Sequence, residues 1–425
     1  MKKKWILIVI IVCLILCVSV IKLYRGSDSE KKKVVFLNNL MEMSHKLEEY
    51  EKSFEELHPD IDIKIESIGE QYENISVVRL NSNNAGDIMI VPSYMNISDY
   101  PDYYEPLYNT ADALKKYRFT DINSIDDKVY SIPLSMNISG GILFDMKVLN
   151  NAGIEKIPSS LDELKEALKA VKSKNDAVPL YSNARGDSEL TCWNSLVYST
   201  EEDPNYENSM IYKRDIFSPD NGYYDVYKLL YESVSEDLIE EPFAASKWND
   251  GLGLIKQGKL GVAVVSYDMY VQAKECALNS DFIVYSPLKS KNNKHYLYGK
   301  PSYGIGINKD SNNKEEAKIW LEYLLNNTDF LEYAGDSEML VGSHGLRFEE
   351  YADSNGYKII YPQNMSKEDS GKFEKIDNEA CLGIYGGSFT FNLINAASEG
   401  KSTYNQLCDD WNNRWNSATE EINKK

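Results

Sequence analysis

The chain has 425 residues, with 66 Asp and Glu side chains against 46 Lys and Arg, and a formal net charge of −20 at pH 7. Nucleic acids and anionic lipids bind basic surfaces, so this charge balance argues against both as partners. The composition fits an exported protein that binds an uncharged ligand. The length is enough for two domains of ordinary size behind an N-terminal segment.

The N-terminus predicts attachment to a membrane. Three lysines, residues 2–4, precede an apolar run over residues 5–21 that only Ser19 interrupts. This run is at the lower limit of the roughly 17–25 residues that span a bilayer, and the lysines keep the N-terminus inside. A cleavage site of small residues is missing, and Leu16 is a poor residue to precede an acylated cysteine. We expect residues 1–26 to be an uncleaved anchor on the outer face of the membrane, with lipidation at Cys17 as the alternative.

Metal and enzyme motifs are missing from the sequence. Beyond the N-terminal segment, the cysteines are widely spaced, no CxxC occurs and the four histidines are scattered. We therefore expect no metal and no other cofactor. The sequence contains no GxSxG, HExxH, P-loop or Rossmann fingerprint, so we expect no enzyme activity. Four cysteines remain: Cys192, Cys276, Cys381 and Cys408. They allow three disulfide pairings, and isolated thiols are the alternative.

Strands and helices alternate in the first hundred residues. Residues 34–38 read as a buried strand, and the next helix carries apolar residues at helical spacing. A second strand over 61–65, a helix near 70–82 and a third strand over 88–91 follow. This β-α-β-α-β order predicts an α/β fold with a parallel sheet between helices. The apolar face of the first helix comprises Leu47, Tyr50, Phe54 and Leu57.

The next feature is a predicted joint at residues 130–148. A short strand ends at Ile132 and Pro133, the pair Gly140-Gly141 follows, and a second strand begins at Ile142. Glycine tolerates large changes of φ and ψ, and a hinge needs a few such residues. The pair therefore predicts a hinge between two packed units.

The second half of the chain repeats this alternation. Ser160 with Glu163 predicts a capped helix start with an apolar run behind it. Asn313 with Glu316 predicts a second capping box, at the start of a helix over 314–325. The C-terminal region reads as further helices.

Several motifs along the chain, in order, resemble those of family 1 extracellular solute-binding proteins. These proteins are the carbohydrate receptors of ABC importers, and maltose-binding protein is one of them. The resemblance covers about residues 34–420 and rests on residues 54–61 (FEELHPDI), 130–148, 158–164 (PSSLDEL), 257–264 (QGKLGVAV) and 303–309 (YGIGINK).

The resemblance implies a two-lobed, periplasmic-binding-protein-like fold in which each lobe is a mixed sheet flanked by helices. Lobe one would hold residues 34–137 and 296–341, and lobe two residues 142–293 and 346–425. The chain would cross the hinge between them near 138–141, 294–298 and 342–345.

Ligands of open α/β sheets bind beyond the carboxyl ends of the strands, and a sugar site needs aromatic faces and planar polar groups. Trp193 could stack on a ligand or pack in the core. Relatives of maltose-binding protein carry an acidic residue after the third strand, where this chain has Tyr94. The resemblance therefore does not predict which sugar is bound. The predicted ligand-binding residues are Asn38, Asn39, Ser93, Tyr94, Asn137, Ser139, Arg185, Trp193, Tyr267, Asp268, Tyr298, Tyr303, His344 and Arg347.

The function that the resemblance implies is capture of a mono- or oligosaccharide outside the cell by a membrane-tethered monomer. The partner would be the transmembrane subunits of an ABC permease. Two alternatives remain: a receptor of the same fold that signals through a membrane sensor, and a surface enzyme that degrades carbohydrate.

Overall fold

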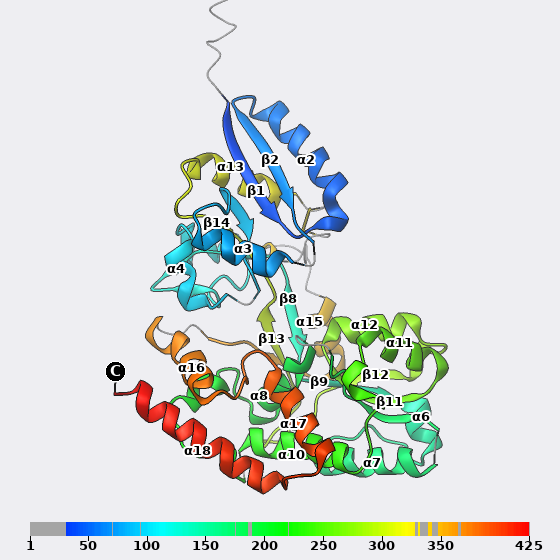
Figure 1. Cartoon of the computed structure of the whole chain (residues 1–425). Helices are drawn as coiled ribbons and strands as arrows, with labels where there is room; N and C mark the ends of the chain where they lie inside the picture. The colour runs from blue at the N-terminus through cyan, green and yellow to red at the C-terminus, as the bar shows by residue number, and fades with distance from the viewer. Residues whose placement is uncertain are drawn as a thin grey trace, which may run out of the picture.

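The structure is a computed structural model in which two lobes are joined by the strands β8 (Met136–Ser139) and β13 (Tyr296–Pro301) (Figure 1). None of the described helices is both long and apolar enough for a bilayer span. The predicted anchor over residues 1–26 lies outside the described residues. The structure describes residues 31–69, 71–93, 95–174, 176–185, 189–219, 221–327, 330–331, 339–341, 347–363 and 367–424.

Lobe one is built on a five-stranded sheet in the order β2-β1-β3-β14-β7. Strand β1 runs parallel to both β2 and β3, which confirms the arrangement predicted from the β-α-β-α-β alternation. Strand β14 returns from lobe two and pairs antiparallel with β3 and β7, so the sheet is mixed. The strands are β1 (Lys32–Asn38), β2 (Ile61–Ser67), β3 (Ile88–Ile90), β7 (Ile132–Pro133) and β14 (Gly304–Ile307).

Helices α2 (Ser44–Leu57), α3 (Tyr72–Asn81) and α13 (Lys314–Leu325) flank this sheet (Figure 1). Helix α2 buries Leu47, Tyr50 and Phe54, and the ring of Phe54 meets Trp320 of α13 edge-on at 4.9 Å. Leu57 was wrongly placed on this face, because it ends the helix and is 68% exposed.

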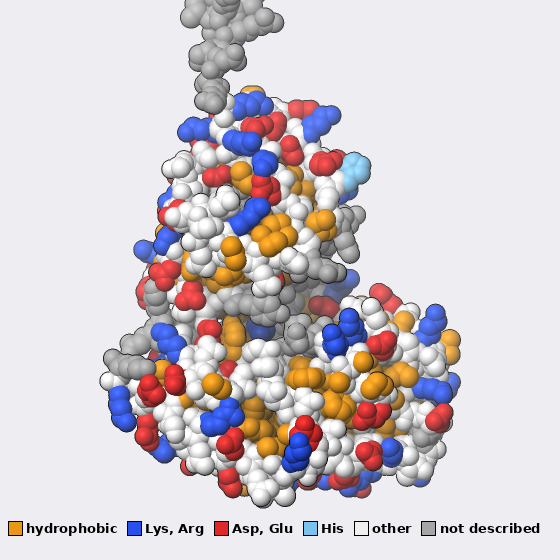
Figure 2. Space-filling view, in the orientation of Figure 1, with side chains coloured by type: hydrophobic (Ala, Val, Ile, Leu, Met, Phe, Trp, Pro, Cys, Tyr) orange, Lys and Arg blue, Asp and Glu red, His pale blue; other side chains and the backbone are white. Residues whose placement is uncertain are grey.

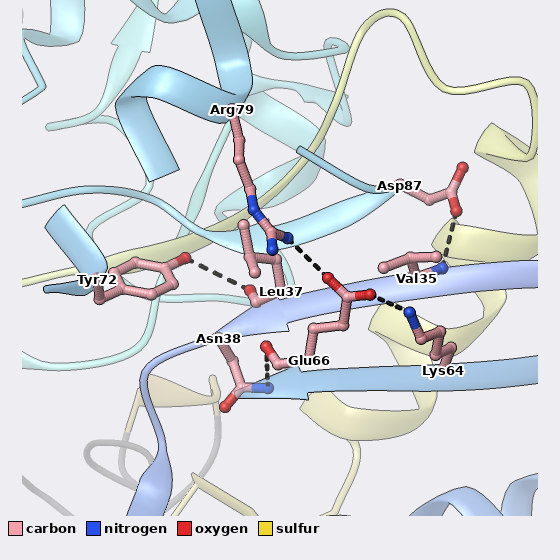
Figure 3. Close-up of polar contacts among 8 residues, drawn as sticks. All are labelled: Val35, Leu37, Asn38, Lys64, Glu66, Tyr72, Arg79 and Asp87. Carbon is pink, nitrogen blue, oxygen red and sulfur yellow. Dashed lines mark hydrogen bonds and ion pairs between the residues drawn. The ribbon is translucent and has the colours of Figure 1, made fainter. Parts of the chain in front are cut away.

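Asp87 connects three segments of lobe one. Its Oδ2 accepts from the backbone N–H of Val35 at 2.8 Å (Figure 3). Its Oδ1 accepts from Ser311 Oγ at 2.6 Å. Asn313 donates to the same carboxylate and to the carbonyl of Lys33. The capping box predicted at Asn313 is therefore wrong, because this side chain fastens the start of α13 to β1 and caps nothing.

Replacing Asp87 by alanine should lower the free energy of unfolding by about 2–3 kcal/mol. The substitution leaves a strand N–H and two side-chain donors without their acceptor, and each buried loss of this kind costs about 1–3 kcal/mol. Urea denaturation checks the value. The exposed Asp310, in the neighbouring turn, gives the matched control Asp310→Ala, and an equal loss in both variants would contradict the expectation.

Lobe two is built on a four-stranded sheet in the order β10-β11-β9-β12. The core on one face of this sheet contains Ile142 and Phe144, together with residues of α7, α8, α10, α17 and α18. Leu143 points to the opposite face, which α11 and α12 cover. The strands are β9 (Gly141–Asp145), β10 (Val178–Tyr181), β11 (Leu260–Val265) and β12 (Ile283–Ser286), and the helices are α7 (Leu161–Lys174), α8 (Cys192–Glu201), α10 (Gly222–Ser235), α11 (Trp248–Gln257), α12 (Tyr267–Cys276), α17 (Ser388–Glu399) and α18 (Tyr404–Ile422).

The connection between the lobes is a three-stranded sheet in the order β15-β13-β8, with β15 at Lys358–Ile360. Tyr298 faces Ser139 across the antiparallel pair, and Lys300 faces Asn137. Residues that face each other in such a pair lie on one side of the sheet, so these four side chains share a face. The third predicted crossing, near 342–345, lies outside the described residues.

Candidate ligand-binding site

A cavity of about 250 Å³ lies between the lobes, in front of the shared face of β13. Lobe one contributes the end of β3 and the residues after it, and a loop over residues 122–125. The connection contributes part of β13 and the turn that leads to β14. Lobe two contributes α9 (Tyr206–Met210), α16 (Lys367–Ala380) and the turn before α17. The polar and aromatic side chains of the wall are Ser93, Asn96, Tyr100, Asn123, Ser124, Tyr198, Asn205, Glu207, Asn208, Tyr298, Lys300, Ser302, Tyr303, Gln363, Phe373, Glu374 and Tyr385.

Three of the predicted ligand-binding residues line this cavity: Ser93, Tyr298 and Tyr303. Asn137 and Ser139 lie on the same face of the connecting sheet as Tyr298. The strand-end rule thus brought together residues from both sides of the connection. Two other predicted residues, Tyr94 and His344, lie outside the described residues.

Four of the predicted residues lie away from the cavity wall. Asn38 is fully buried, and its Oδ1 accepts from the N–H of Leu40 at 2.9 Å, while its Nδ2 points to the carbonyl of Glu66 (Figure 3). Its amide therefore holds β1 and β2 together. Asn39 and Arg185 are exposed, and Trp193 is buried in the core of lobe two with 1% exposure.

The remaining predicted residues form a second group beside α12. Tyr267 is half-buried, and its ring centre lies 5.2 Å from that of Tyr351. Asp268 and Arg347 are exposed. Burial raises the pKa of both Tyr267 and Asp268, and the nearby charge of Arg347 opposes this rise. These residues join α12 to the start of α15 (Arg347–Asn355).

Sequence reasoning missed the lobe-two wall of the cavity. Glu207 lies on α9, Glu374 on α16 and Tyr385 in the turn before α17. None of these follows a strand, so the strand-end rule could not select them. The sequence Tyr385-Gly386-Gly387 was the available signal, since a large aromatic residue beside two glycines in a turn has little core to pack against.

Two carboxyl groups give the cavity its electrostatic character. Glu207 Oε1 accepts from the hydroxyl of Tyr198, and burial raises the pKa of Glu207. Glu374 of lobe two accepts from Asn96 of lobe one, and burial together with the charge of Asp99 raises the pKa of Glu374. On the face shown in Figure 2, acidic and basic side chains are interspersed over both lobes, so these two groups are a local feature.

Tyr298 stands between the two lobes with an available hydroxyl. The residue is 7% exposed, and its ring meets that of Tyr198 edge-on at 4.9 Å. Burial strongly raises the pKa of Tyr298, so the phenol keeps its proton at neutral pH. Among the described residues the hydroxyl has no hydrogen-bond partner. It can therefore donate to a ligand or accept from one.

The described residues contain no group of His, Cys, Asp and Glu side chains that could hold a metal ion. No disulfide joins the four cysteines of the described residues, and Cys192 and Cys408 are buried.

Comparison with known proteins gives the family. Residues 42–329 match the family described as bacterial extracellular solute-binding protein. Two curated relatives are the multiple sugar-binding protein of Streptococcus mutans (26% identical over 159 residues, 36% of this chain) and the melibiose/raffinose/stachyose-binding protein MelE of Bacillus subtilis (27% over 171 residues, 37% of this chain). The match spans 37% and 38% of the length of those relatives.

A solved structure matches over far more of the chain. It is BlMnBP1, a binding protein of an ABC transporter from Bifidobacterium animalis subsp. lactis, in complex with mannobiose. The TM-score is 0.76 at 25% identity, with 92% of this chain and 95% of the other chain covered. The two-lobed fold and the resemblance stated from the motifs are confirmed. Since the family match extends over more than half of its residues, the chain belongs to the bacterial extracellular solute-binding proteins.

Proposed function

We propose that this protein captures a carbohydrate in the cavity between its lobes and delivers it to the transmembrane subunits of an ABC permease. The observation that carries the proposal is the cavity wall, which combines aromatic rings with amides and carboxyls. Aromatic faces cover the apolar faces of a sugar ring, and planar polar groups fix its hydroxyls. The sugars named for the relatives support the same class of ligand.

The size of the cavity favours a small carbohydrate. Ligand pockets commonly measure roughly 300–1,000 Å³, and this cavity of about 250 Å³ is below that range. A mono- or disaccharide unit fits such a space. A ligand there would touch Ser93 and Asn96 of lobe one and Asn205 and Tyr385 of lobe two. Contacts from both lobes would hold the lobes together around the ligand.

The cellular arrangement is part of the same proposal. Residues 5–21, or a lipid on Cys17, would hold a monomer at the extracellular face of the cell membrane. The lobe limits would be those expected from the resemblance, with residues 34–137 and 296–341 in lobe one and residues 142–293 and 346–425 in lobe two.

A thermal-shift panel of mono- and oligosaccharides tests the proposed function. A sugar that binds the folded chain but not the unfolded chain stabilises the fold by RT ln(1 + c/Kd), where c is the free sugar concentration, so the melting temperature rises with the sugar concentration. We expect at least one small carbohydrate to raise it, and no hydrolysis of that carbohydrate. If no sugar of the panel raised the melting temperature, carbohydrate capture would be contradicted. Hydrolysis of the bound sugar would favour the alternative of a carbohydrate-degrading enzyme.

Replacing Tyr385 by alanine should weaken binding of the sugar found in this way by about thirtyfold. A stacking aromatic residue in a binding site contributes about 2 kcal/mol on truncation. Tyr385 is 38% exposed, so the melting temperature should change little. Isothermal titration calorimetry measures the affinity, and Tyr212→Ala, which removes a tyrosine that is 70% exposed and lies outside the cavity wall, is the control. Equal affinity in wild type and Tyr385→Ala would contradict the assignment.

A further inference from the structure

We propose that the carbohydrate in this cavity carries a protonated amino group, seated between Glu207 and Glu374 against the ring of Tyr385. The inference rests on the proposed function and adds the charge of the ligand to it. Its parts are two carboxyl groups that form no ion pair among the described residues, an aromatic residue that lines the same cavity, and the hydroxyl of Tyr298, which has no hydrogen-bond partner in that part of the chain.

The two carboxyl groups come from different elements and face one space. Glu207 on α9 and Glu374 on α16 both line the cavity, and neither forms an ion pair with a Lys or Arg in the described part of the chain. Among the described residues, the groups that donate hydrogen bonds to them are neutral: Tyr198 for Glu207, and Asn96 and Asn378 for Glu374. A buried carboxylate without a cation is costly, and a ligand ammonium group would offset that cost.

The charges around the pair leave the site negative. Asp99 and Asp377 lie close enough to Glu374 to raise its pKa, and Lys375 on the same helix opposes them. Lys300 is the one basic residue of the described cavity wall. Its charge opposes the rise in the pKa of Glu207, and its side chain on β13 is exposed to solvent. Four carboxyl groups thus stand against two amines.

Asp377 itself is occupied, because its carboxylate accepts from the backbone N–H groups of Ile384 and Tyr385 at 3.1 and 3.0 Å. These two bonds fix the turn that carries Tyr385. The ring of Tyr385 therefore has a defined place in the wall.

The aromatic groups suit a cation. Glu207, Glu374 and Tyr385 line the same cavity, and the two carboxyl charges add to the rise in the pKa of Tyr385 that burial causes. A ring face attracts an ammonium group, and the attraction grows when water is excluded. Tyr298 is 7% exposed, lies near Glu207 and Tyr385, and has no hydrogen-bond partner among the described residues. Its oxygen can accept an N–H of the same ammonium group.

Matched sugar pairs that differ only in an amino or a hydroxyl group at one carbon test the proposal. The pairs are glucosamine with glucose, mannosamine with mannose, galactosamine with galactose, and the glucosamine disaccharide with cellobiose. Titration calorimetry at about pH 6.5, where the amine is charged, should show about tenfold tighter binding of the amine in the pair that binds best. About 0.5 M NaCl should reduce this preference.

Two isosteric variants locate the charge. Glu207→Gln and Glu374→Gln should each remove most of the preference for the amine over its neutral partner, whatever the affinity of each variant for the neutral sugar. Glu379→Gln changes an exposed carboxyl on the same helix as Glu374 and should leave the preference unchanged. If Glu207→Gln fails to fold, Glu374→Gln carries the test alone.

The outcomes separate this inference from the proposed function. Neutral sugars that bind as tightly as their amino partners would overturn the inference and leave carbohydrate capture standing. If Glu374→Gln kept the preference for the amino sugar, the proposed position of the ammonium group beside Glu374 would be wrong. Folded protein that binds no sugar of either kind would overturn carbohydrate capture and the inference with it.

Discussion

Replacing Gly140 by alanine should lower the free energy of unfolding by about 2–5 kcal/mol. Gly140 has φ +77°, and a Cβ there would lie 1.9 Å from Ser199 Oγ and 2.8 Å from the carbonyl oxygen of Ser195. A non-glycine residue at positive φ costs about 1–3 kcal/mol, and overpacking adds about 1–3 kcal/mol. The serine side chain can turn away from the new methyl group, but the backbone carbonyl of α8 cannot.

Urea denaturation of wild type and Gly140→Ala measures this loss. Gly253→Ala is the control, because Gly253 lies on α11 with no atom within 4 Å of a built Cβ. Alanine stabilises a helix interior relative to glycine by about 1 kcal/mol, so the control should be neutral or slightly more stable. If Gly140→Ala matched the control, the close approach of the backbone to α8 would be wrong.

The same geometry changes how the glycine pair is understood. From the sequence, Gly140 and Gly141 predicted a hinge because glycine is conformationally free. In the structure, both positions are closely packed, since a Cβ on Gly141 would lie 2.4 Å from the ring of Tyr285. Close packing alone accounts for the two glycines, and hinge motion at this place stays a prediction.

The elements that the sequence predicted best are those whose burial shows in the residue pattern. The first three strands of lobe one are short apolar or alternating runs, and their parallel pairing follows from the helices between them. The errors lie where a side chain had two possible partners. Asn313 could cap α13 or join β1, and only the fold brings Asp87 and Lys33 within its reach.

The candidate site was predicted only in part, for a related reason. Ser93 comes after β3, so a rule about strand ends selects it, and Tyr298 and Tyr303 lie near a predicted crossing between the lobes. Glu207 and Glu374 lie on helices more than a hundred residues apart, and the tertiary packing of lobe two brings them to one wall. In a chain with 66 acidic residues, nothing local distinguishes those two from the others.

Trp193 was the predicted ligand-binding residue whose role could be decided either way, and its surroundings favour the core. It is the second residue of α8, and every residue of that helix from Cys192 to Ser199 is buried. The helix lies in the core of lobe two with α10 and α17. With 1% exposure, the indole has no surface to offer to a ligand in this conformation.

Replacing Trp193 by alanine should therefore lower the free energy of unfolding by about 3–5 kcal/mol, the usual cost of truncating a large core aromatic residue. Below the lowered melting temperature, the folded fraction should bind its sugar with unchanged affinity, because the cavity wall does not include this residue. Trp193→Phe should cost less, since the smaller ring leaves a smaller void. Tyr385→Ala should show the opposite pattern, with weaker binding and a nearly unchanged melting temperature. Measured together by thermal unfolding and calorimetry, the two alanine variants separate packing from recognition. A Trp193→Ala protein of normal stability and weak affinity would return the indole to the ligand site.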